Sequence, residues 1–329
     1  MRNRSSRRNP DRGVRIEARA KINLGLAVGP RREDGYHELA TVFQSISLAD
    51  TLVVAPKSRG FSLTIRYQDV SVPRRGATGF LRRGRRPRTG AGRVPEGRGN
   101  LVLRAAQLLA DRHGLPGGAA FTLIKRIPVR TGLGGGSADA AAALVGLARL
   151  HGLRWSLRDR LAIGAELGSD VPFTLLGGTA LGLGRGERLR RLRLAAPFRA
   201  VLAVPSWRVE TARAFRALDR GKYALTGWSL NLRFAEALGR KAVRPNHALR
   251  LGNAFEKVLG ERRSGFLSLC ARLRHAGAEE PHLTGSGSAV FGILPARLTA
   301  LRFVDRFAGD EAIYLIRSRG TGLTHHALR

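Results

Sequence analysis

Apolar residues occupy every second position from Val14 to Val28, the first strongly periodic segment of the chain. The intervening positions begin with polar side chains: Arg15, Glu17, Arg19, Lys21 and Asn23. A period of two residues is typical of a strand with one buried face, so the pattern predicts one long strand, or two strands joined by a bend. Lys21 and Asn23 would lie two residues apart on its polar face. Shorter runs predict strands over 51–55 and 61–67.

Capping residues and helical periodicity predict the next elements. Asn100 is a candidate N-cap for a helix over 101–112, residues 119–126 have the composition of a strand, and a helix follows Ser156 to about Leu167. An Ala-rich helix follows a glycine run. We expect Ser137 to be its N-cap and Asp139 to lie in its first turn.

The second half of the chain, from about residue 194, mixes strands and helices without a regular βαβ alternation. We expect strands at 199–204 and 312–318, a hairpin at 282–294, and helices at 211–218, 229–239, 253–260, 264–275 and 296–307. This mixture indicates the α+β class. A chain of 329 residues is long enough for two domains, which we place at 14–193 and 194–329.

Composition excludes several classes of protein. At 43% hydrophobic residues the chain can bury a core, and its single cysteine, Cys270, rules out intramolecular disulfides and Cys-clustered zinc sites. No apolar run approaches the ~20 residues that cross a bilayer, and the first residues lack the apolar stretch of a signal peptide. We therefore expect a cytoplasmic protein without a membrane partner, either a monomer or a homodimer.

The positive charge is the most unusual feature of the composition. The chain has 58 Lys and Arg against 24 Asp and Glu, a formal net charge of +34, and only six of the basic residues are lysine. The arm 1–13 and the stretch 73–99, which holds nine Arg and seven Gly, are predicted to be basic loops. Such a charge attracts nucleotides and other anions. We expect nucleic-acid binding, through the stretch 73–99, only as a side activity.

A glycine-rich segment, PVRTGLGGGSAD over residues 128–139, carries the strongest chemical signal. It lies between a predicted strand and a predicted helix, where glycines let the backbone approach a ligand and the helix start attracts anions. The segment lacks the GK[ST] ending of a Walker loop and the last glycine of the dinucleotide-binding GxGxxG pattern. A phosphate-binding loop and a flexible connection both fit this composition.

Two shorter segments add weaker signals. Asp170 follows a predicted helix in LGSDVPF, and the small residues TGSGS occupy 284–288 between apolar strands. Each of these, taken alone, is also explained by an ordinary turn.

Taken in order, these segments resemble the GHMP small-molecule kinases. The resemblance spans Val14 to Arg317 and rests on ARAKINLGLAVGPRREDGYHELATVFQSISLADTL, RGNLVLRAAQLL, PVRTGLGGGSADAAAAL, GSDVPF, NAFEKVL and LTGSGSAVFGI. It implies an N-terminal domain like ribosomal protein S5 and a ferredoxin-like C-terminal domain. Within the family, the segment Gly35-Tyr36-His37 favours members that phosphorylate the 2-hydroxyl of a cytidine-diphosphate-linked methylerythritol, in the non-mevalonate route to isoprenoids. The basic arm, the stretch 73–99 and the net charge depart from the family pattern.

The resemblance also implies roles for individual residues. Asp170 would act as the base for the acceptor hydroxyl, with Lys21 beside it. ATP, accompanied by Mg²⁺, would be bound by Pro128, Gly132, Leu133, Gly134, Gly135, Gly136, Ser137 and Ala138. The small-molecule cytidine diphosphate substrate would be bound by Asn23, Tyr36, His37, Phe215, Gly285, Ser286 and Gly287. The protein ligand of the metal is not assigned; Ser137 is a candidate.

Two alternatives stay open at this point. A GHMP kinase acting on homoserine, mevalonate or galactose would share the fold and the glycine-rich segment. An RNA-binding protein with an S5-like fold would use the positive charge, but it would leave the glycine-rich segment and Asp170 without a purpose. Aromatic residues make up only 6% of the chain, and it carries no RNP or KH signature, which argues against this second alternative.

Overall fold

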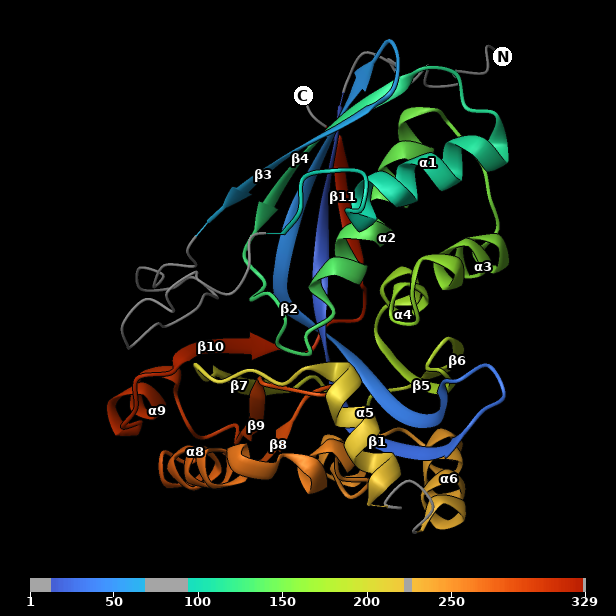
Figure 1. Cartoon of the computed structure of the whole chain (residues 1–329). Helices are drawn as coiled ribbons and strands as arrows, with labels where there is room; N and C mark the ends of the chain where they lie inside the picture. Colours follow the sequence, from blue (N-terminus) through green and yellow to red (C-terminus); the bar gives the residue numbers. More distant parts are fainter. Residues whose placement is uncertain (1–12, 69–93, 222–226, 328–329) are drawn as a thin grey trace, which may run out of the picture.

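The computed structural model describes residues 13–68, 94–221 and 227–327 and contains two β-sheets (Figure 1). Most of the predicted basic arm, residues 1–12, and residues 73–93 of the Arg- and Gly-rich stretch lie outside these ranges. Strands and helices are mixed throughout, so the predicted α+β class is confirmed.

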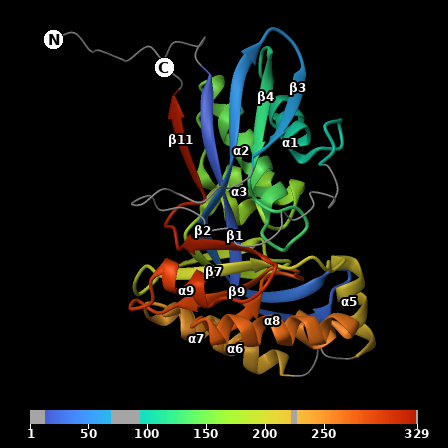
Figure 2. The ribbon, with the colours of Figure 1, turned by 90° about the vertical axis from the view of Figure 1, so that its left-hand side faces the viewer.

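The first sheet has seven strands, in the order β11-β1-β2-β4-β3, with β5 pairing β2 and β6 pairing β5. They are β1 (Val14–Arg31), β2 (His37–Lys57), β3 (Phe61–Tyr67), β4 (Gly118–Lys125), β5 (Thr179–Gly184), β6 (Arg188–Leu192) and β11 (Leu323–Ala327). Helices α1 (Leu101–His113), α2 (Gly135–Leu150), α3 (Leu157–Leu167) and α4 (Val171–Leu176) lie together on one side of this sheet, as Figures 1 and 2 show. The Ala-rich α2 is buried in the hydrophobic core between this sheet and α1, because its small side chains allow close packing on β1 and β2.

The second sheet is antiparallel and has four strands, in the order β10-β7-β9-β8. They are β7 (Arg199–Val204), β8 (Glu279–Leu283), β9 (Val290–Leu294) and β10 (Ala312–Arg317). The helices of this half of the chain are α5 (Thr211–Arg220), α6 (Trp228–Ala237), α7 (Pro245–Leu249), α8 (Arg263–His275) and α9 (Ala300–Arg306), with 3₁₀ turns at Leu238–Arg240, Ala254–Val258 and Gly260–Arg262. Of these, α6 packs on β1 and β2 of the first sheet. The long β1-β2 hairpin extends from the first sheet to this part of the molecule (Figure 1).

The hairpin explains why one prediction about β1 is wrong. The alternating pattern predicts a polar face open to solvent, but Lys21 and Asn23 are both buried. Leu26 and Val28 pack in the same core as residues of the second sheet and of α8, so this half of β1 is covered on both faces. Register shifts between Arg19 and Lys21 and between Asn23 and Gly25 bend the strand there, in agreement with the predicted bend.

Several predicted boundaries need correction. The run 51–55 is only the end of the 21-residue β2, and the helix predicted at 253–260 is two short 3₁₀ turns. The strand at 312–318 is not the last one, because β11 follows it and pairs with β1. Five elements were not predicted from the sequence: β5, β6, β11, α4 and α7. The short α4 and α7 offer too few residues for a helical period to be recognised.

Candidate active site

The glycine-rich segment forms the turn into α2. Gly134 is the N-cap residue with φ 70°, and no side chain caps the helix, so its first backbone N–H groups point toward the segment without a side-chain partner. The prediction that Ser137 is the N-cap is wrong, because α2 begins at Gly135 and Ser137 is its third residue. The prediction that Asp139 lies in the first turn is also wrong. The left-handed φ of Gly134 lets the backbone start the helix earlier than the capping pattern indicates.

Two neighbouring segments hold this turn in place. The Leu133 carbonyl accepts a hydrogen bond from the Lys21 amide at 3.0 Å, and the Thr131 carbonyl accepts one from the Ala289 amide at 3.1 Å. Gly132 has φ 81°, and a Cβ there would lie 2.2 Å from the Thr284 carbonyl oxygen. A glycine is therefore required at 132, and the turn is fixed against both β1 and the loop 284–289.

Lys21 and Asp170 meet beside Gly134. The Lys21 Nζ lies 3.4 Å from Asp170 Oδ2, and a Cβ on Gly134 would lie 3.1 Å from the Lys21 Cγ and 3.6 Å from the same carboxylate oxygen. The side chain of Lys21 is 7% exposed, whereas that of Asp170 is 31% exposed. An ammonium, a solvent-accessible carboxylate and an uncapped helix start thus converge at one point.

Asn23 connects this point to the loop 284–289. Its side-chain oxygen accepts hydrogen bonds from the Lys21 ammonium at 2.8 Å and from the Gly285 amide at 2.9 Å. The Asn23 amide group donates to Thr41, and Ser286 is hydrogen-bonded to Thr211 at the start of α5. The polar side of β1 and the small-residue loop therefore form one network, although Asn23 and Gly285 are 262 residues apart.

A buried cluster of charged residues connects α2 to β4 and β2. Lys125 donates to Asp139 at 2.7 Å and also to Asp50, which accepts from the Ile127 amide at 2.8 Å. Burial raises the pKa of Asp139 to about 8; the Lys125 ammonium opposes this shift and the Asp50 charge adds to it. The two carboxylates in turn raise the pKa of Lys125, despite its burial. Asp139 is therefore a structural residue that ties α2 to β4 and β2.

The three aromatic residues expected to bind a base do not all touch. His37 stacks on Phe215, with ring centroids 5.2 Å apart. Its Nδ1 lies 3.1 Å from the Gly29 carbonyl oxygen and its Nε2 lies 3.2 Å from Asp219, a residue of α5. Tyr36 is 53% exposed, and its ring centroid is 5.0 Å from the Arg185 guanidinium. A base could therefore reach Tyr36 directly, whereas a bond to the His37 ring requires the Asp219 contact to open.

The described residues contain no group of three or more His, Cys, Asp and Glu side chains placed to hold a metal ion. Magnesium that travels with a nucleotide needs few protein ligands, because phosphates and water supply most of its coordination. The Ser137 hydroxyl lies at the start of α2 and makes no hydrogen bond to other described residues, so it fits that limited requirement.

Comparison with known proteins identifies the family of this chain. Residues 100–178 match the GHMP kinases N terminal domain. A 4-diphosphocytidyl-2-C-methyl-D-erythritol kinase of Pelotomaculum thermopropionicum is 39% identical over 308 residues, which cover 92% of this chain and 96% of the relative. The enzyme of the same name from Moorella thermoacetica is also 39% identical, over 88% of this chain and 93% of its own length.

The chain belongs to the 4-diphosphocytidyl-2-C-methyl-D-erythritol kinase family. A crystal structure of a 4-(cytidine 5'-diphospho)-2C-methyl-D-erythritol kinase, 36% identical, superposes with a TM-score of 0.69 over 93% of this chain and 99% of the other. A homoserine kinase from Cytophaga hutchinsonii reaches a TM-score of 0.66 over 97% of this chain and 99% of its own at 17% identity, which shows a shared fold alone. The predicted family, the GHMP kinase fold and the class of small-molecule kinase are thereby confirmed.

Of the residues proposed for the site, the structure gathers Lys21, Asn23, Asp170, the turn 132–137 and the loop 285–287 around one point. Tyr36, His37 and Phe215 form a second group on the β1-β2 hairpin and α5, where only His37 and Phe215 stack. Sequence analysis missed three contacting residues: Asp219, Arg185 and Thr284. Asp219 is a single charged residue on the amphipathic α5, and Arg185 lies in the turn between β5 and β6, so neither has a local sequence signal that indicates a contact with the site.

Proposed function

We propose that this chain transfers the γ-phosphoryl group of ATP to the 2-hydroxyl of 4-diphosphocytidyl-2-C-methyl-D-erythritol, in the non-mevalonate route to isoprenoids. One observation supports the proposal above all: the Lys21–Asp170 ion pair lies directly beside Gly134, at the uncapped start of α2. Phosphoryl transfer needs positioned phosphates, a stabilising cation and a group that accepts the proton of the attacking hydroxyl. All three requirements have a residue at this point.

Asp170 is the proposed base. Its carboxylate is partly open to solvent, so an acceptor hydroxyl can approach it, and it lies within 4 Å of the position where a side chain on Gly134 would begin. It would take the proton of the tertiary hydroxyl as the new P–O bond forms. Lys21, held by the Asn23 side chain, would stabilise negative charge on the oxygens of the group being transferred.

The turn 132–137 is the proposed phosphate site. The backbone N–H groups at the start of α2 have no side-chain cap, and the helix dipole favours an anion there. The Ser137 hydroxyl would be the protein ligand for Mg²⁺, and the ion would neutralise part of the phosphate charge. Pro128, Leu133 and Ala138 would contribute packing, since their side chains are apolar and those of Leu133 and Ala138 are buried.

The cytidyl end of the substrate is proposed to lie on the β1-β2 hairpin. Tyr36 offers an exposed ring, and Phe215 lies on the facing α5, where it stacks on His37. Because both nitrogens of His37 already have protein partners, base recognition by its side chain would exchange the Asp219 contact for a contact to cytosine. Gly285–Gly287, bonded to Asn23, would line the path between the two ends.

A substrate panel tests the proposal. Consumption of ATP would be measured with the cytidyl-erythritol substrate, homoserine, mevalonate and galactose under the same conditions. We expect turnover with the cytidyl compound alone. Turnover with homoserine or mevalonate but without the cytidyl compound would overturn the assignment, and the Asp170→Asn variant serves as the control for contaminating kinases.

The remaining expectations from the sequence stay proposals. They are the domain division at 193/194, a cytoplasmic location, a monomeric or homodimeric state, and nucleic-acid binding as a side activity. No helix in the described ranges is long and apolar enough to span a membrane.

Deletion of residues 76–96 should lower retention on a nucleic-acid column while kinase activity is kept, since phosphate contacts scale with the number of basic residues.

A further inference from the structure

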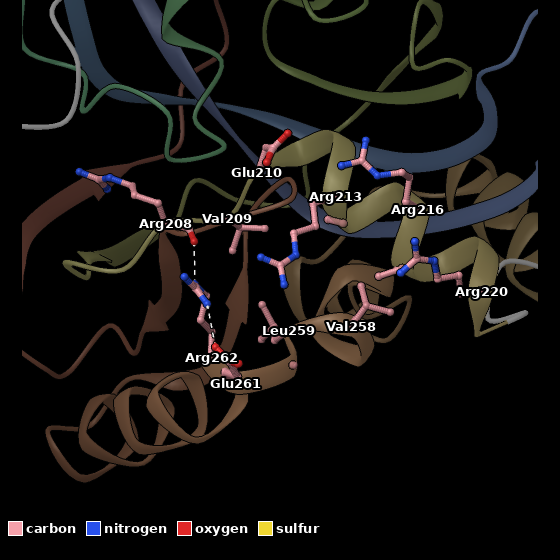
Figure 3. A pocket seen from close by; sticks show the side chains of 13 residues that line it. Arg208, Val209, Glu210, Arg213, Arg216, Arg220, Val258, Leu259, Glu261 and Arg262 are labelled. Carbon is pink, nitrogen blue, oxygen red and sulfur yellow. Dashed lines mark hydrogen bonds and ion pairs between the residues drawn. The ribbon is translucent and has the colours of Figure 1, made fainter.

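A groove of about 700 Å³ lies between α5 and the 3₁₀ turns at 254–262 (Figure 3), and neither Lys21 nor Asp170 lines it. Its floor is apolar and includes Val209, Ala214, Ala217, Val258 and Leu259. Five arginines line it: Arg208, Arg213, Arg216, Arg220 and Arg262. Its volume is in the range of about 300–1,000 Å³ that small-molecule sites occupy.

Four of these arginines, all except Arg262, have no ion pair with an acidic residue in the described part of the chain. Arg213, Arg216 and Arg220 recur at i, i+3 and i+7 along α5, and none of them has an ion pair within the described residues. Burial lowers the pKa of Arg208, and no carboxylate offsets the effect. Like charges four residues apart on a helix repel each other, as Arg216 and Arg220 do here. An anion in the groove would remove this repulsion.

Among the five arginines, Arg262 is the one whose side chain hydrogen-bonds to the backbone of the described residues. Arg262 donates from Nε to the Arg208 carbonyl at 2.8 Å and so joins the two walls of the groove, and it lies 3.9 Å from Glu261 (Figure 3). The Glu261 side chain is 94% exposed, so water screens its charge. The two acids that line the groove, Glu210 and Glu261, do not neutralise it.

We propose that this groove binds a small organophosphate, a phosphate or diphosphate group joined to an apolar body. Guanidinium groups match phosphate oxygens in paired hydrogen bonds, and the apolar floor would cover the rest of the ligand. Neither the donor nor the acceptor of the proposed reaction is assigned to it. The inference rests on the groove alone and does not depend on the proposed function.

The groove is connected to the proposed substrate site through α5. On its other side α5 carries Phe215, which stacks on His37, and Asp219, which contacts the His37 ring. At its start, Thr211 is hydrogen-bonded to Ser286. A ligand that holds α5 against the 3₁₀ turns therefore restricts the helix that carries one of the two proposed base-stacking rings, and the affinity for the cytidyl substrate should change with it.

Calorimetric titration of the full chain tests the site, with hexyl phosphate, inorganic phosphate and hexanol as probes. Arg213→Ala/Arg220→Ala is the test variant, and Arg302→Ala/Arg306→Ala on α9 is the control with the same loss of charge from exposed helix positions. We expect saturable binding of hexyl phosphate, at least about tenfold tighter than inorganic phosphate. We expect a roughly 10- to 100-fold weakening in the test variant and less than about twofold in the control.

Three results would overturn the proposal. Equal affinities for hexyl phosphate and inorganic phosphate would show that the apolar floor of the groove plays no part. Equal weakening in both variants would show that overall charge, not the groove, attracts the probe. Binding of a single-stranded RNA that excludes hexyl phosphate and is lost in the test variant alone would assign the groove to nucleic acid. A change in KM for the cytidyl substrate at saturating hexyl phosphate would support the link through α5.

Discussion

Removal of Asp170 and Lys21, separately and together, tests whether these two residues act as one catalytic unit. Asp170→Asn keeps the size of the side chain but cannot accept the proton, so kcat should fall by about 10²–10⁴. Lys21→Ala removes the cation beside the carboxylate and should lower kcat by about 10²–10³. Affinity for ATP should change little in Asp170→Asn, since the N–H groups at the start of α2 remain.

The size of the coupling follows from the geometry. Unit charges 3.4 Å apart attract by about 5 kcal/mol at an effective dielectric constant of about 20. Because the Asp170 side chain is 31% exposed, water screens part of this, and about 1–3 kcal/mol is a reasonable coupling. The double variant should therefore lose roughly 5- to 150-fold less activity than the product of the two single losses.

The assay is a single-turnover measurement of phosphoryl transfer at saturating ATP and cytidyl substrate, so that product release does not mask the chemical step. Asp305→Asn on α9, an exposed position, is the matched control and should leave kcat unchanged. Losses that multiply in full would show that Lys21 and Asp170 act independently. Turnover near that of the unmodified protein in Asp170→Asn would remove it from the role of base.

Three further predictions concern the turn, the buried cluster and the base site. Gly132→Ala places a Cβ 2.2 Å from the Thr284 carbonyl oxygen, so it should weaken ATP binding at least about tenfold and lower the Tm, whereas Gly97→Ala, which meets no atom within 4 Å, should do neither. Because the pKa of Asp139 is raised to about 8 in the folded protein, the free energy of unfolding should fall as pH rises from about 4, the unfolded pKa, to 8. Asp139→Asn lacks this titration, so its free energy of unfolding, measured with urea, should increase relative to that of the unmodified protein over this range. A difference that stays constant with pH would contradict the shift. Tyr36→Ala should weaken the cytidyl substrate about 10- to 100-fold in a direct binding measurement and leave ATP affinity nearly unchanged; equal losses for both ligands would mean that Tyr36 serves only the hairpin turn.

Elements with a local signal were predicted correctly. Asn100 caps α1 by accepting from the Val102 amide, and Ser156 forms a capping box with Asp159 at the start of α3. Strand β7 lies at 199–204 as expected, and β8 and β9 form the predicted antiparallel pair. In each case the determining contacts lie within a few residues, so the sequence displays them directly.

The candidate site was predicted at the level of its residues and not of its contacts. The order of the motifs indicated the family. The predicted positions of Ser137 and Asp139 in α2 were nevertheless wrong, because the left-handed Gly134 is the N-cap and starts the helix three residues earlier than expected. The role of Asp139 also depends on Lys125 and Asp50, which lie on different strands. No pattern within α2 could show that its carboxylate is buried.

The sequence by itself determined the α+β class, most helices, the glycine-rich turn before α2 and the family, since these depend on short-range periodicity, glycine content and the order of motifs. Only the tertiary structure decided that Lys21 and Asn23 are buried, that Asp170 faces Gly134, and that α5 carries Phe215, stacked on His37, on one side and lines an arginine-rich groove on the other. The physical reason is that burial and electrostatic pairing depend on segments far apart in the chain. Asn23 belongs to the site because its backbone amide donates to the Thr284 hydroxyl, 261 residues away, and its side-chain oxygen accepts from the Gly285 amide.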